Sequence, residues 1–204
     1  LREYLRPNVK NVLFMYYEGN DFDDLNRELE SEILLKYLKD LNFSQNLKSK
    51  QNQIDEMSTI KMIDEKKKQK QHNRFIFKFL DFIKISNLRF LISLPKSLSK
   101  PQPQFKEILK FAKDLALKNN SKFYFVYLPN YGRYKTHYRI SNLDYFTDSY
   151  VSVKKIVNEL NIPFIDIHEE VFLKESDPLK LFPFKMSLQH YNVEGYKKVT
   201  EAIY

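Results

Sequence analysis

Apolar residues in this chain gather in short runs that alternate with stretches of helical spacing. The runs at 12–17, 123–129 and 162–167 are rich in Val, Ile, Phe and Tyr, which is typical of strands buried on both faces. Apolar residues recur every three or four positions at 25–33, 105–116, 150–160 and 196–203, and this spacing predicts helices. Strands and helices that alternate with short loops predict an α/β fold, with a parallel sheet covered by helices on both faces.

Polar residues mark where two of these helices begin. Acidic residues crowd the first turn after the run at 12–17, so we expect Asp21 to cap a helix that carries Leu25, Leu29 and Ile33 on one face. Asn192 is placed to cap the last helix.

Residues 42–94 differ from the rest of the chain. Ser, Asn, Gln and Lys dominate 42–74, and four lysines close that stretch at 66–70. We expect a solvated, partly helical insertion, with a basic arm for anionic lipid or polymer as the alternative. Phe79, Phe82 and Ile83 then lie at helical spacing and predict a helix packed on the domain or a stripe that binds a partner. We treat 1–204 as a single domain with an insertion at about 42–94.

The net charge of +8 changes this picture little. Only 7 of the 34 basic residues are Arg, the residue preferred for bidentate contacts with phosphates and bases. The same chain is rich in Lys, Asn, Ile, Phe and Tyr, which AT-rich codons encode. Nucleic acid is therefore disfavoured as a partner, and nonspecific binding by the Lys-rich insertion is kept as a third hypothesis.

The sequence contains no Cys, which excludes disulfides, thiolate metal sites and thiol nucleophiles. None of the 4 His residues has metal-ligand spacing with another, so we expect neither a metal nor another cofactor. No apolar run approaches the roughly 18 residues of a membrane span, and no signal peptide is recognisable. We expect a soluble chain whose compartment is open. Because it begins at Leu1, we also expect a fragment or a processed product.

Two polar clusters could carry chemistry. Gly19, Asn20 and Asp21 follow the first expected strand, and sites in parallel sheets gather beyond the carboxyl ends of strands. Gly permits close approach and the Asn amide offers two N–H donors, so this segment suits an oxyanion as well as a plain turn. His190 directly precedes the last helix, where its ring either acts as a general base or packs under Tyr196.

Taken together, the clusters resemble a known family. YYEGNDFDDL at 16–25 and HYNVEGYKKV at 190–199 look like two motif blocks of the SGNH, or GDSL-like, hydrolases, and the resemblance covers 8–38 and 104–204. It implies that Asn20 serves the oxyanion hole and that His190 is the catalytic base, with Gly19 and Tyr191 contacting the substrate. It also implies a three-layer α/β/α fold with a flavodoxin-like sheet.

The resemblance implies an esterase or acyltransferase that acts on O-acyl bonds by Ser-His chemistry. No Gly-Asp-Ser occurs in the sequence, so the family's nucleophile is absent. We therefore expect the C-terminal part of such an enzyme, inert by itself, with a sheet incomplete at its N-terminal side. The expected substrate is a small-molecule or carbohydrate ester. Because an incomplete sheet exposes an edge, we expect a homo-oligomer or association with the missing N-terminal segment.

The chain departs from the family pattern in ways that favour an alternative. Ser187 stands three positions before His190, where the family has Asp, so Asp177 or a backbone carbonyl would have to orient the base, or the site is a dyad. Gly19 directly precedes Asn20, which compresses the block, and only 3 Gly occur in the chain. The alternative is a non-catalytic SGNH-like binding or scaffolding module.

Overall fold

The computed structural model describes residues 1–72, 101–134, 140–185 and 190–204. The expected stripe of Phe79, Phe82 and Ile83 lies outside these residues, as does Ser187. The chain divides into two compact units, one formed by Leu1–Phe43 with Leu98–Tyr204 and the other by Ser44–Ser97.

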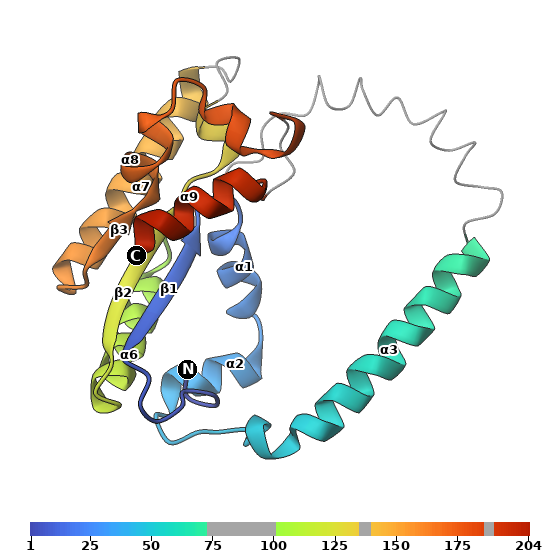
Figure 1. Cartoon of the computed structure of the whole chain (residues 1–204). Helices are drawn as coiled ribbons and strands as arrows, with labels where there is room; N and C mark the ends of the chain where they lie inside the picture. The colour runs from blue at the N-terminus through green and yellow to red at the C-terminus, as the bar shows by residue number, and fades with distance from the viewer. Residues whose placement is uncertain (73–100, 135–139, 186–189) are drawn as a thin grey trace. The chain divides into compact units, whose positions relative to one another are not determined.

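The first unit contains a parallel sheet of three strands (Figure 1). They are β1 (Asn11–Tyr17), β2 (Lys122–Leu128) and β3 (Phe164–Asp166), in the order β1-β2-β3. Tyr17 pairs with Leu128, and Tyr127 pairs with Asp166. The carboxyl ends of all three strands therefore meet at one edge, and the α/β class is confirmed.

Helices connect these strands as the apolar spacing indicates. α1 (Asp21–Glu28) and α2 (Glu32–Lys39) follow β1, α6 (Pro103–Lys118) precedes β2, and α7 (Ile140–Glu159) lies between β2 and β3. The short α8 (Ile167–Glu170) and α9 (Val193–Ile203) complete the unit. α6 buries Phe105, Leu109, Ala112 and Ala116, and Asn120 beyond its end takes a left-handed conformation with φ 58°, which is a common way for helices to end.

The prediction of one continuous helix after β1, carrying Leu25, Leu29 and Ile33 on one face, is wrong. The helix stops at Glu28 and a second one starts at Glu32, and Ile33 is 45% exposed rather than packed with Leu25. Asp21 is not the cap either. Asn20 holds the N-cap position, while the Asp21 carboxylate accepts a hydrogen bond from the Tyr17 backbone N–H at 2.8 Å.

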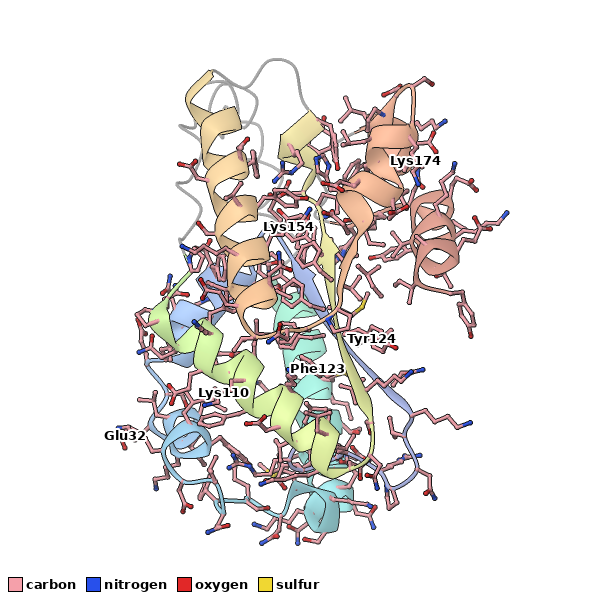
Figure 2. All side chains as sticks on the ribbon, turned by 90° about the vertical axis from the view of Figure 1, so that its left-hand side faces the viewer. Glu32, Lys110, Phe123, Tyr124, Lys154 and Lys174 are labelled. Atoms are coloured by element: carbon pink, nitrogen blue, oxygen red, sulfur yellow. The ribbon has the colours of Figure 1, made fainter. Side chains whose placement is uncertain are left out.

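Alternate side chains of β2 pack into two hydrophobic clusters. Phe123, Phe125 and Tyr127 belong to a cluster with residues of α1, α6 and α7, whereas Val126 belongs to one with residues of α8, α9 and the segment 171–191. Since neighbouring side chains on a strand point to opposite faces, helices cover both faces of the sheet. Figure 2 shows Phe123 on the α6 side of β2 and Tyr124 on the other side.

β1 lies at one edge of the sheet and is less covered than β2. Its outer side has no partner strand among the residues that the structure describes. Leu13 is 40% exposed and Met15 is 45% exposed, and Met15 pairs with Val126 in the register, so both project from the α9 face. An apolar strip therefore borders an open strand edge.

The second unit is described as far as residue 72. It contains a 3₁₀ turn (Leu47–Lys50) and the long helix α3 (Gln51–His72), on which Met57, Ile60, Met62 and Ile63 are exposed. The boundaries of the insertion at about 42–94 stay a prediction, as does the assignment of 1–204 to one domain. Within the described ranges, the chain has no helix with the length and apolar character that crossing a membrane requires.

Candidate functional site at the carboxyl edge of the sheet

Polar side chains collect where the three strands end. Glu18 follows β1, the segment from Pro129 to Tyr134 follows β2, and His168 comes shortly after β3. In open α/β sheets, ligands bind in a crevice outside the carboxyl ends of the strands. The two motifs singled out in the sequence also reach this edge.

Glu18 is the centre of a buried polar cluster. The residue is 5% exposed, and its carboxylate accepts hydrogen bonds from the Tyr127 hydroxyl, from Arg133 Nε at 3.1 Å and from the Asn130 backbone N–H at 3.0 Å. Arg133 Nη2 also pairs with Glu18 and donates to the Phe146 carbonyl at 2.8 Å. A buried carboxylate is tolerated only when it is paired and hydrogen-bonded, so this cluster fastens the loop after β2 to the end of β1.

The Tyr127 phenol stays protonated inside this cluster. Burial, and then the neighbouring charge of Glu18, raise the pKa of Tyr127 well above its usual value. Its hydroxyl therefore donates to the carboxylate over the whole physiological range.

Gly19 provides room for the loop after β2. A Cβ at this position would overlap the Tyr17 ring and lie 2.7 Å from Nδ2 of Asn130. Asn130 can therefore approach the turn after β1 only because residue 19 has no side chain. The need for glycine here arises from close approach, since Gly19 does not have a positive φ.

Asn20, the expected oxyanion donor, lies at the start of α1. Its side chain forms no capping bond, and its Nδ2 donates to Asp24 Oδ2 at 2.7 Å. A carboxamide nitrogen carries two N–H groups, so this bond orients the amide and leaves one N–H to donate elsewhere.

Asp21, next to Asn20, has a carboxyl group with an unusual pKa. Burial, opposed by the hydrogen bond from the Tyr17 N–H, raises the pKa of Asp21 to about 6. Its position is fixed by that backbone hydrogen bond, so Asp21 holds the turn together.

The second motif surrounds the start of α9. His190 is exposed. Tyr191 is 5% exposed and its hydroxyl donates to the Pro129 carbonyl at 2.7 Å, so this expected substrate contact lies in the core. Asn192 caps α9 as expected, since its Oδ1 accepts from the Gly195 N–H at 2.9 Å.

The loop after β2 links the two motifs. Tyr191 bonds to Pro129, and the next residue, Asn130, packs against Gly19. His190 and Asn20 are the immediate neighbours of Tyr191 and Gly19. The structure thus brings both motifs to the carboxyl edge, while a common cavity that His190 and Asn20 both face stays a prediction.

His168 is a candidate residue that the sequence analysis did not single out. Its Nδ1 lies 2.7 Å from the Tyr134 hydroxyl. Burial, and then the positive charge of Arg133, lower the pKa of His168 to about 4, so the ring is neutral at physiological pH. Its position two residues after β3 is the signal in the sequence that could have found it.

A second polar group lies between α7 and α8. The Tyr150 hydroxyl lies within hydrogen-bond distance of Asp166 and, at 2.8 Å, of Glu169 Oε1, and Lys154 Nζ donates to the same two carboxylates at 3.3 and 3.2 Å. These bonds join α7 to the end of β3 and to α8. Among the described residues, no group of three or more His, Asp or Glu side chains could hold a metal ion.

The sequence and the structure were compared with known proteins. No protein-family model matches the chain, and no match to a curated protein or to a solved structure was found.

Proposed function

We propose that this chain carries the oxyanion-hole and base motifs of an SGNH-like esterase or acyltransferase that acts on O-acyl bonds. The observation that supports it most is the contact chain from Tyr191 through Pro129 and Asn130 to Gly19. It brings together the two motifs that the mechanism needs, although Asn20 and His190 lie 170 positions apart in the sequence.

In this mechanism His190 and Asn20 act on one tetrahedral centre. The sequence has no Gly-Asp-Ser, so the nucleophilic serine comes from a segment outside these 204 residues. His190 takes the serine proton as the serine oxygen attacks the ester carbonyl, and returns it to the departing alcohol. The free N–H of Asn20 donates to the oxyanion that forms, which is worth about 3 kcal/mol in comparable sites.

The remaining residues of the motifs support this arrangement. Because Gly19 has no side chain, the loop after β2 can approach the turn after β1. Tyr191, the residue next to His190, binds that loop through its hydrogen bond to Pro129. Asp177 is engaged in its own segment, where its carboxylate accepts from the Leu179 N–H at 3.2 Å. A carboxylate can accept further hydrogen bonds, so orientation of His190 by Asp177 or by a backbone carbonyl, and a Ser-His dyad, all stay predictions. A small-molecule or carbohydrate ester is the proposed substrate.

The proposal includes the finer fold assignment. The three parallel strands, with helices on both faces, are part of a three-layer, flavodoxin-like domain. Its sheet continues beyond β1, whose outer side is open and whose Leu13 and Met15 are exposed.

Labelling of the parent polypeptide tests the proposal. A fluorophosphonate, which reacts with activated serines, is added to the full-length gene product and to its His190→Ala and His72→Ala variants. We expect a serine to be labelled in the parent and in His72→Ala, and labelling to be lost in His190→Ala. The 204-residue chain by itself should not be labelled.

Two results would contradict the proposal. An unlabelled parent, or equal labelling of parent and His190→Ala, excludes His190 as the base. An unlabelled parent favours the alternative, a non-catalytic SGNH-like binding or scaffolding module, to which Ser187 in place of the family's Asp already points. Equal labelling would mean that a group other than His190 activates the serine.

A further inference from the structure

The Asn130 side chain is held rigidly at the turn that contains Asn20. Its Oδ1 accepts a hydrogen bond from the Gly132 N–H at 2.8 Å, and its backbone N–H donates to Glu18 at 3.0 Å. Its backbone carbonyl accepts from the Arg133 N–H at 3.2 Å. The residue is thus fixed through both its main chain and its side chain.

These bonds also decide which way the amide faces. Only an oxygen can accept from the Gly132 N–H, so the Asn130 NH₂ group must point away from Gly132. It points to Gly19, where Nδ2 lies 2.7 Å from the position of the absent Cβ. Within the described part of the chain, this NH₂ group donates to no acceptor, and the residue is partly exposed.

We infer that Asn130 is a second amide donor of the site, which binds an acyl oxygen of the substrate together with Asn20. The inference rests on the proposed function for the identity of the substrate. Two carboxamides at one turn, one oriented by Asp24 and the other by Gly132, offer N–H groups to a single oxygen. Preoriented donors of this kind stabilise developing negative charge because they need no reorganisation when the charge appears.

The buried ion pair gains a role from this inference. The Glu18 and Arg133 side chains are buried, and they hold the backbone of the loop that presents Asn130. They are positioning residues. The cost of burying this carboxylate is offset by four hydrogen bonds from three residues, Tyr127, Asn130 and Arg133.

An NMR titration of the 204-residue chain tests the inference. The probe is dimethylphosphinate, a tetrahedral monoanion that imitates the intermediate of acetyl-ester cleavage. We expect the side-chain amide signals of Asn130 and Asn20 to shift along one saturation curve. Asn130→Asp keeps an oxygen that accepts from the Gly132 N–H and replaces the NH₂ donor by an anionic oxygen. Binding of dimethylphosphinate should therefore weaken about tenfold or more. Asn11→Asp adds the same charge at the opposite end of β1 and should bind as the unmodified chain does.

The outcomes separate this inference from the proposed function. If Asn20 responds and Asn130 does not, the inference is wrong and the proposed function stands. If Asn130 responds and Asn20 is silent, Asn130 binds the anion and the oxyanion role of Asn20 is contradicted. If neither amide shifts, the inference is overturned, and fluorophosphonate labelling still decides the proposed function. The signals of the unmodified chain give these answers even if Asn130→Asp does not fold.

Discussion

Gly19 has no space for a side chain, and this makes a clear prediction at the scale of one residue. Gly19→Ala would force its methyl group against the Tyr17 ring and the Asn130 amide, and we expect a loss of about 2 kcal/mol in the free energy of unfolding. Urea denaturation measures it. Gly132→Ala is the matched control, because its Cβ would lie 3.0 Å from the end of the Phe146 ring and make an ordinary contact of 3.6 Å with Asn130 Oδ1. An equal loss in the two variants would contradict the close approach at Gly19.

His168 should make stability depend on pH. Its pKa is about 4 in the folded chain, against an ordinary value of 6.5, so between these values the unfolded chain binds more protons. The contribution of His168 to stability is therefore complete above pH 6.5 and is lost as the pH falls toward 4. His168→Gln removes this titration.

The pH effect is measured as a difference between two proteins. Unfolding free energies of the unmodified chain and of His168→Gln are compared at pH 7 and pH 5, and the advantage of the unmodified chain should shrink at pH 5. The pKa of Asp21, raised to about 6, acts in the opposite direction because its protonation favours the folded state. This contribution cancels in the difference. An advantage that is equal at both pH values would show that His168 titrates normally.

At the scale of elements, two asparagines precede helices but do different work. Asn192 accepts from the Gly195 N–H at the start of α9, whereas Asn20 makes no capping bond to α1. We expect Asn192→Ala to lower the free energy of unfolding by about 1 kcal/mol and Asn20→Ala to lower it clearly less. Thermal unfolding of the two variants measures both changes. If the proposed function holds, Asn20→Ala should also lower the rate of ester cleavage by the full-length gene product about a hundredfold. A larger loss of stability in Asn20→Ala would assign it a structural role only.

The sequence predicts most elements because their burial determines their pattern. β2 buries both faces and appears as one apolar run, and α6 buries every third or fourth residue. Asn192 was found as a cap because capping depends only on neighbouring backbone groups. The break between α1 and α2 was missed because the four-residue spacing of Leu25, Leu29 and Ile33 continues across it. In the structure Ile33 is exposed and does not share a buried face with Leu25.

The candidate site was less predictable because distant residues create it. Gly19 and Asn130 each resemble ordinary turn residues, and only folding shows that they contact each other. The buried pair of Glu18 and Arg133 joins positions far apart in the sequence. His168 looks like a surface residue beside two glutamates until Tyr134 and the loop after β2 cover it. The pattern of apolar residues depends on which faces of one helix or strand are buried. The site depends on contacts between residues of different elements, which that pattern does not show.

At the scale of the whole molecule, the open side of β1 should affect association. Leu13 and Met15 are exposed beside a strand edge without a partner in the described chain, a combination that promotes pairing with another chain. We expect sedimentation equilibrium to show concentration-dependent self-association that Met15→Lys weakens. Met57→Lys, at a position that is 71% exposed on α3, should leave it unchanged. A stable monomer at all concentrations would contradict this expectation.

β2 contributes side chains to both hydrophobic clusters and has a strand on each side. Its backbone hydrogen bonds can therefore break only when both faces of the sheet come apart, whereas those of β1 can open together with the edge. In hydrogen exchange the amides of β2 should be the last of the sheet to take up deuterium, at a rate set by global unfolding, while β1 exchanges through smaller, local openings. The turn that holds Gly19 and Asn20 thus follows the more readily opened strand, and the loop that presents Asn130 follows the most persistent one.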